Sequence, residues 1–379
     1  MPNIFARSPY IIEVDESNVV GSQLDLTFYY PGTSPGSAQY VLKKKISSSN
    51  NLKMYYDIAP YCREYLKFTT RQTVIGTLPT TSGIVASNNN QYVLLRVQRY
   101  KENTNGTLSI LDTTTYYCFD GYGYYSEGSN PANSDFAYQT GQYATLKEGT
   151  YNYKYSSSSN PTSNADDRAG ILGVFGASSI TSVKYTDLVT GGTTTFTNPF
   201  GASNTLYDVP TVWAGYYANG NKLELWQSIS VPSATLLGTW IFKPTCEPKY
   251  TPVMIDFVNK FGYWQREFFF KASKNNISVE QKDYNLMQSN SLSYSTLEGQ
   301  RKSFNTNGQE NITVNTGFVP ESYKETIQEI MLSEKILIDS LPVLLNTKSI
   351  EKIKGINAES PINYTMEFKY AFDIINSVI

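Results

Sequence analysis

Hydrophobic and polar residues alternate along much of this chain with the two-residue period of a β-strand. The clearest example is the segment 361–372, which has an apolar side chain at every second position: Ile362, Tyr364, Met366, Phe368 and Tyr370. Because successive side chains of a strand point to opposite faces, such a segment buries one face. Similar short segments recur between turns rich in Gly, Pro, Asn and Ser. The pattern predicts a mainly β protein of several small antiparallel β-sandwich, immunoglobulin-like domains.

The most aromatic segment, residues 250–270, predicts a β-hairpin. Val253, Ile255 and Phe257 share one face of its first strand. Gly262 supplies the turn residue, and a second aromatic run follows it at once. A hairpin with so many aromatic side chains is not expected to stand alone in water. We therefore expect it to be buried, either against other strands or against another subunit.

Turn-rich stretches divide the chain into three expected domains. Residues 1–68 form an N-terminal β-sandwich, and residues 69–245 form a central strand-and-loop region. The central region contains a Tyr-, Gly- and Ser-rich loop at 120–164. Residues 246–379 form a C-terminal β-domain with one short helix at 320–332, where Pro320 suits the first turn.

Two further local predictions concern strands. The segment 212–217 in the central region is predicted to be a short strand. In the C-terminal domain, residues 301–305 and 311–315 are predicted to pair as a hairpin that turns at 306–308, because that stretch reads Thr-Asn-Gly.

Composition excludes several functional classes. The chain has 379 residues, a formal net charge of −2 and only 17% charged residues, which argues against a nucleic-acid binder, because such a protein needs a basic face. No stretch approaches the ~20 apolar residues of a membrane span. The N-terminus has no apolar run of signal-peptide length, which indicates folding in a cytoplasm.

Catalytic motifs are absent from the sequence. Without histidine, the Ser-His-Asp and Cys-His arrangements are excluded, and there is no GxxxxGK phosphate loop. Cys62, Cys118 and Cys246 are odd in number and widely spaced, so we expect reduced thiols rather than a disulfide framework or a zinc site. We therefore expect no enzyme activity and no cofactor.

Two acidic positions keep weaker alternatives open. Glu224, beside Leu225 and Trp226, could belong to a glycosidase carboxylate pair, although an acid on the outer face of a strand is the commoner case. The Asp166-Asp167 pair could bind calcium, but the alternating ligand spacing of a calcium loop is missing.

Aromatic residues in two segments are the candidate protein–protein contacts, because tyrosine supplies contact area at low entropic cost. The expected contacts are Tyr122, Tyr124, Tyr125, Tyr151, Tyr153 and Tyr155 in the central loop, and Phe261, Tyr263 and Trp264 at the hairpin tip. For the loop, the alternative is disordered low-complexity sequence. For the tip, the alternative is that its aromatic side chains belong to a domain core.

Five segments carry a resemblance to a known family: MPNIFARSPYII, DIAPYCREYL, PVMIDFVNKFGYWQREFFFKAS, ENITVNTGFVPESYKETIQEIMLSEKILI and PVLLNTKSIEKIKGINAESPINYTMEFKYAF. They resemble tail or structural virion proteins of tailed bacteriophages that infect Bacteroidota, including crAss-like and flavobacterial phages. The resemblance covers the N-terminal and C-terminal domains but not the central region. It implies a component of the tail, collar or neck that contacts copies of itself, as a ring, and other virion proteins. It carries over no catalytic residue.

Two other functions remain open. One is a receptor- or carbohydrate-binding module at the tail tip, with a host surface glycan as its partner, because aromatic platforms and amide side chains suit sugar recognition. The other is a glycosidase that degrades host polysaccharide, and it has the least support in the sequence.

Overall fold

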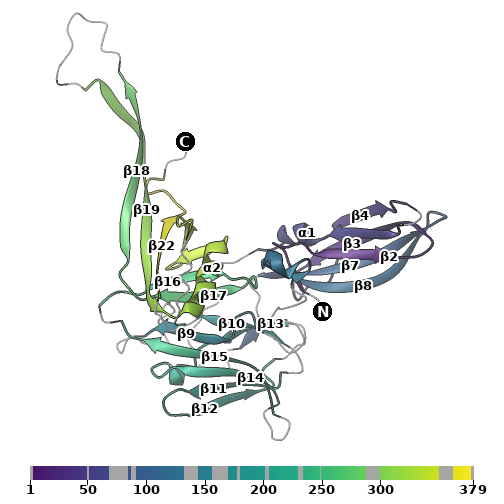
Figure 1. The fold of residues 1–379 in the computed structure, drawn as a ribbon, viewed down its shortest axis with the longest axis horizontal. Helices are drawn as coiled ribbons and strands as arrows, with labels where there is room; N and C mark the ends of the chain where they lie inside the picture. The colour runs from purple at the N-terminus through teal and green to yellow at the C-terminus, as the bar shows by residue number, and fades with distance from the viewer. Residues whose placement is uncertain are drawn as a thin grey trace, which may run out of the picture. The chain divides into compact units, whose positions relative to one another are not determined.

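A computed structural model shows a mainly β chain with one short helix near the C-terminus, which confirms the predicted fold class (Figure 1). The described residues are 3–48, 51–67, 84–86, 91–131, 144–155, 170–176, 180–200, 205–228, 234–247, 249–286, 297, 299–349 and 362–376. The chain forms two compact units. The first comprises Met1–Cys246 and Asp256–Glu267, and the second comprises Glu247–Ile255 and Phe268–Ile379.

The N-terminal part of the first unit is a sandwich-like pair of sheets. The larger sheet has the order β1-β8-β7-β3-β4, made of β1 (Asn3–Phe5), β8 (Leu108–Phe119), β7 (Tyr92–Asn103), β3 (Val19–Tyr29) and β4 (Tyr40–Lys45). The smaller sheet pairs β2 (Ile11–Asp15) with β5 (Lys53–Asp57), and α1 (Ala59–Arg63) follows it. The sequence placed the end of the N-terminal domain at residue 68. Strands β7 and β8 lie beyond that residue and nevertheless complete the larger sheet.

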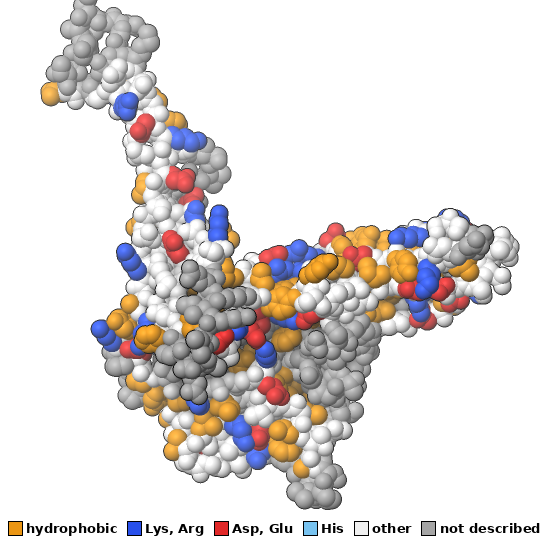
Figure 2. Space-filling view, in the orientation of Figure 1, with side chains coloured by type: hydrophobic (Ala, Val, Ile, Leu, Met, Phe, Trp, Pro, Cys, Tyr) orange, Lys and Arg blue, Asp and Glu red, His pale blue; other side chains and the backbone are white. Residues whose placement is uncertain are grey.

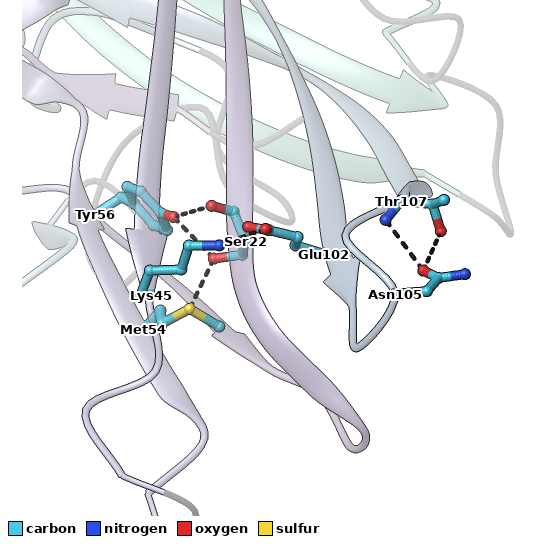
Figure 3. Close-up of polar contacts among 7 residues, drawn as sticks. All are labelled: Ser22, Lys45, Met54, Tyr56, Glu102, Asn105 and Thr107. Carbon is cyan, nitrogen blue, oxygen red and sulfur yellow. Dashed lines mark hydrogen bonds and ion pairs between the residues drawn. The ribbon is translucent and has the colours of Figure 1, made fainter.

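Alternating apolar residues of both sheets form the core between them. Leu24 and Leu26 of β3 and Leu95 of β7 are fully buried there, together with Met54 and Tyr56 of β5. Polar groups also join the two layers. Figure 3 shows Tyr56 and Met54 of β5 reaching Ser22 of β3, whose Oγ lies 2.8 Å from the Tyr56 hydroxyl and 3.0 Å from the Met54 Sδ.

One ion pair on this sandwich predicts a dependence of stability on pH. Arg99 of β7 donates from Nη2 to Asp112 Oδ2 at 2.7 Å, and this hydrogen bond lowers the pKa of Asp112 below its ordinary value of 3.8. The stabilisation is therefore present above about pH 4 and disappears as the pH falls through the lowered pKa. Because both side chains are about one-third exposed, we expect Asp112→Asn to destabilise the protein by ~1 kcal/mol or less at pH 7. Denaturant unfolding should show this difference at pH 7 and a smaller one near pH 2; an equal difference at both pH values would contradict the prediction.

The central part of the first unit contains two more sheets. A three-stranded sheet has the order β10-β13-β6, made of β10 (Ile171–Gly176), β13 (Thr205–Pro210) and β6 (Val85–Ala86). A five-stranded sheet has the order β12-β11-β14-β15-β9, made of β12 (Thr193–Thr197), β11 (Ser182–Asp187), β14 (Asn221–Ser228), β15 (Thr235–Thr245) and β9 (Gly149–Lys154).

Two local predictions for the central region are wrong. The predicted strand 212–217 is instead a 3-10 helix, η5 (Ala214–Tyr216), whose turn is closed by the hydrogen bond from Tyr216 N to Trp213 O at 3.0 Å. The predicted loop 120–164 contains strand β9, which pairs in parallel with β15. Residues 132–143 and 156–169 of that loop lie outside the described residues.

A seven-stranded sheet with the order β17-β16-β20-β21-β22-β19-β18 dominates the C-terminal part of the chain. Its strands are β16 (Val253–Val258), β17 (Trp264–Phe269), β18 (Lys274–Asn285), β19 (Arg301–Val319), β20 (Ile336–Ile338), β21 (Leu341–Leu345) and β22 (Ile362–Tyr370). Strands β16 and β17 form the predicted hairpin, which turns at Gly262 with φ of 77°.

Helix and strand predictions had different outcomes in this part. The helix is confirmed as η6 (Glu321–Tyr323) followed by α2 (Lys324–Leu332), which buries Ile327 and Ile330. The hairpin predicted at 301–315 is wrong, because β19 runs through it as one strand. Asn305 has a positive φ of 54°, and the pairing with β18 shifts register nearby, so the Asn- and Gly-rich stretch marks a β-bulge rather than a turn.

Candidate functional site

The three candidate tyrosines that follow β8 differ in exposure. Tyr122 is buried and Tyr124 is half-buried, whereas Tyr125 is fully exposed. The Lys260 ammonium lies 4.5 Å from the centre of the Tyr124 ring, and Lys260 also forms an ion pair with Glu127. Of these three rings, Tyr125 is therefore the one available in full to another molecule.

The candidate tyrosines of β9 pack within the central region. Tyr153 is fully buried, and its hydroxyl donates to the Tyr217 carbonyl, while burial raises the pKa of Tyr153 far above its ordinary value. The Tyr151 ring stacks on Phe242 with 5.7 Å between ring centres. The Tyr155 ring lies 5.4 Å from that of Tyr217. These side chains therefore contribute to packing against β15 and η5, and are not displayed on an open loop.

Most of the hairpin tip is core. Tyr263 and Trp264 are buried and Phe261 is half-buried. Tyr263 belongs to an apolar cluster drawn from β1, β7, β8, β10 and β13, whose other members are Phe5, Tyr92, Tyr117, Phe119, Phe175 and Leu206. The Tyr263 hydroxyl also hydrogen-bonds the buried Asp208 carboxylate. Tyr263 and Trp264 therefore belong to a domain core, which was the alternative expected for the hairpin tip.

Backbone and amide groups fix the position of the turn itself. The Asn259 side chain accepts from the backbone N–H of Phe261 at 3.1 Å and donates to the Thr145 carbonyl at 2.9 Å. The Tyr122 N–H donates to the Lys260 carbonyl at 3.0 Å. The bonds to Thr145 and from Tyr122 link residues far apart in the sequence, so they fix the turn within the first unit.

A buried ion pair joins β16 and β17, the two strands on either side of this turn. Arg266 donates two hydrogen bonds to Asp256, from Nε to Oδ1 at 2.8 Å and from Nη2 to Oδ2 at 2.7 Å. The two side chains are only 3% and 1% exposed. An ion pair removed from water in this way depends strongly on both partners being present.

The feature that sequence reasoning missed is a long exposed ribbon made of β18 and β19. All twelve residues of β18 are exposed, and β18 is the end strand of its sheet. On its other side β19 pairs with β22 only from Asn311 to Val319, and beyond that the Ile374 N–H donates to the Gly308 carbonyl at 2.8 Å. Arg301–Glu310 and the facing part of β18 therefore form a two-stranded ribbon, which the chain after β22 contacts near Gly308 (Figure 1). The signal available in the sequence was the alternation of Ile277 and Val279 with polar residues.

The acidic residues Glu224, Asp166 and Asp167 are the metal-binding and catalytic candidates that the sequence offers. Among the described residues, no cluster of three or more acidic or cysteine side chains could hold a metal ion. Glu224 contacts Lys222 at 2.7 Å and Lys184 at 3.8 Å, which places it between two ammonium groups. Asp166 and Asp167 lie outside the described residues.

The three cysteines are free thiols. Cys62 and Cys118 are buried in the N-terminal sandwich, and Cys246 is exposed. Burial and the neighbouring Cys62 thiol raise the pKa of Cys118 well above its ordinary value, so Cys118 is a protonated, unreactive group at neutral pH.

No protein-family model matches this chain, and no curated protein matches it. In the described part of the chain, no helix is long and apolar enough to span a membrane. What the structure defines is therefore a class by fold, a β-rich, sandwich-like protein with an exposed β-ribbon.

Proposed function

We propose that this chain is a structural component of a tailed-phage virion, located in the tail, collar or neck and present in multiple copies that form a ring. The observation that carries the proposal is the exposed ribbon of β18 and β19. The resemblance of the N-terminal and C-terminal segments to phage structural proteins supplies the kind of assembly.

The physical argument starts from the instability of such a ribbon in isolation. A two-stranded ribbon is marginally stable in water, because it has no second layer against which to bury a face. Large apolar side chains on this ribbon remain exposed, among them Ile277, Val279, Tyr284 and Phe304. The outer edge of β18 also offers a row of backbone groups that can pair with another strand. A ribbon of this kind gains stability when another protein covers it.

The charges on the ribbon favour a second copy of this chain as that protein. The ribbon carries three basic side chains, Lys282, Arg301 and Lys302, and three acidic side chains, Glu280, Asp283 and Glu310. Figure 2 shows these charges scattered along the ribbon and mixed with apolar side chains, not gathered into a field of one sign. A nearly balanced surface is compatible with another copy of itself. Head-to-tail contacts between copies close into a ring when the rotation allows it.

Native mass spectrometry with negative-stain imaging tests the ring, and a two-residue variant tests the ribbon. We expect the wild-type chain to associate into closed rings. Ile277→Lys together with Val279→Lys should weaken self-association at least ~10-fold, which corresponds to 1.4 kcal/mol. The control is Val189→Lys, since Val189 is 73% exposed in the β11–β12 turn and lies outside the ribbon. Equal assembly of both variants and the wild type would remove the ribbon from the contact.

The virion role has a separate test. Peptides of this chain should be found in purified particles of a phage that encodes it, at several copies per particle. Their absence from intact particles, with the protein present in infected cells, would overturn the structural role whatever the isolated chain does in solution.

A further inference from the structure

A hollow in the second unit combines two aromatic rings with polar groups at its rim. Its volume is about 260 Å³, and it is lined by Tyr250, Lys271, Ala272, Asn315, Gly317, Phe318 and Asn363. The lining comes from the segments that flank β16 and β17 and from the paired strands β19 and β22. Phe318 is 76% exposed, which is unusual for a phenylalanine on a strand paired inside a sheet.

A β-bulge is what brings Phe318 to the surface. Along β19, Ile312, Val314 and Thr316 are buried at every second position, and regular alternation would bury residue 318 as well. The pairing with β22 shifts between Asn315 and Phe318, so the side-chain alternation reverses there. The strand thus departs from regular pairing at the position that exposes an aromatic ring.

The bulge is built from specific groups. Gly317 has φ of +73°, a conformation that favours glycine, and a Cβ on it would also displace the Lys271 side chain, whose Cγ would lie 2.8 Å away. The Asn315 carbonyl oxygen Oδ1 accepts from Gly317 N–H at 2.7 Å, while Asn315 Nδ2 donates to Thr365 Oγ1 at 2.9 Å. The geometry that exposes Phe318 is therefore fixed before any ligand arrives.

Two lysine side chains lie near the second aromatic ring of the hollow, that of Tyr250. Lys249 and Lys271 place their ammonium groups 5.2 Å and 6.0 Å from the centre of the Tyr250 ring. Lys271 also pairs with Glu247 at 2.9 Å, and this hydrogen bond lowers the pKa of Glu247. The Glu247 carboxylate thus balances the charge of Lys271. The hollow therefore has no strong preference for an anionic ligand.

We propose that this hollow binds one pyranose ring of a glycan. The positively polarised C–H groups of a sugar fit the negative faces of aromatic rings such as Phe318 and Tyr250, and sugar hydroxyls fit amide and ammonium partners such as Asn363 and Lys271. The volume is below the ~300–1,000 Å³ of pockets for drug-sized ligands, which suits a single sugar unit. This inference goes beyond the assembly role and does not rest on it.

Saturation-transfer NMR on the full chain with D-glucose, D-galactose, D-mannose and N-acetyl-D-glucosamine tests the site. We expect transfer to at least one of these sugars at concentrations up to about 100 mM, where binding far weaker than a Kd of ~1 mM still registers. Phe318→Ala should weaken that binding at least 10-fold. Because Phe318 is exposed, the substitution should leave the unfolding temperature nearly unchanged.

The matched control is Phe372→Ala. Phe372 follows β22, is 45% exposed, and neither lines the hollow nor belongs to the ribbon. Its loss should leave sugar binding as in the wild type. No transfer to any of the four sugars, or transfer that survives Phe318→Ala, would overturn the inference. Neither outcome would affect the ring or the detection of the chain in particles, so failure of the sugar site and failure of the assembly role are distinguishable.

Discussion

Arg266→Met is expected to lower the free energy of unfolding by ~3–5 kcal/mol, because it removes the guanidinium that donates two hydrogen bonds to the buried Asp256 carboxylate. Asp256 and Arg266 are joined by two hydrogen bonds at 2.7–2.8 Å on adjacent strands and are almost completely removed from water. Methionine keeps much of the side-chain volume, so the loss comes from the charge rather than from a cavity. Thermal unfolding of the full chain should show the first transition lowered by ~10 °C.

Two controls separate this effect from a general sensitivity to lost charges. Lys53→Met removes one member of the Lys53–Glu13 pair, whose side chains are 48% and 43% exposed, and should change stability by less than ~1 kcal/mol. The double variant Asp256→Leu with Arg266→Met removes both charges of this ion pair and should recover most of the loss. If Arg266→Met were no worse than Lys53→Met, the pair would not be buried as the structure describes.

Alternation predicted the strands that have one buried face. Strand β22 buries the apolar side chains at its alternate positions, and the structure places it close to where the sequence indicates. Strands β16 and β17 are buried on both faces, and their dense apolar and aromatic runs located them instead. Strand β18 has no buried face at all, so only Ile277 and Val279 marked it. A strand stabilised by its neighbour alone has little pattern to read.

The hairpin prediction for residues 301–315 was wrong because strand pairing, and not the local turn residues, decided the conformation. The Thr-Asn-Gly stretch at 306–308 resembles a hairpin turn, but pairing with β18 on one side and β22 farther along holds β19 in one strand. The bulge that exposes Phe318 was equally hidden, because sequence alternation alone places residue 318 on the buried face.

Tyrosine was the hardest residue type to place from sequence. Its ring is buried readily when the hydroxyl finds an acceptor, as Tyr153 does at the Tyr217 carbonyl and Tyr263 does at Asp208. Composition alone cannot separate such a tyrosine from an exposed one such as Tyr125. The distinction depends on acceptors that only the fold brings within reach.

Gly262→Ala is expected to lower the free energy of unfolding by more than ~3 kcal/mol, through strain and steric conflict together. Gly262 has φ of +77°, and a Cβ there would lie 2.5 Å from the Gly121 nitrogen and 2.7 Å from the Asp120 nitrogen. Both atoms are backbone, so no side chain can rotate away to make room. The turn would have to withdraw from the loop after β8, and Tyr263 would lose its place in the apolar cluster.

Gly106→Ala is the matched control, since Gly106 also occupies a hairpin turn with a positive φ of +81°, but a Cβ added at Gly106 would meet no atom within 4 Å. It should cost only the backbone strain, ~1 kcal/mol. Denaturant unfolding gives the two losses, and hydrogen exchange at the Tyr122 N–H, which donates to the Lys260 carbonyl at 3.0 Å, reports on the turn directly. Gly262→Ala should expose that amide to exchange and Gly106→Ala should not. Equal losses for the two variants, with Tyr122 still protected in both, would mean that the turn is not seated against this loop.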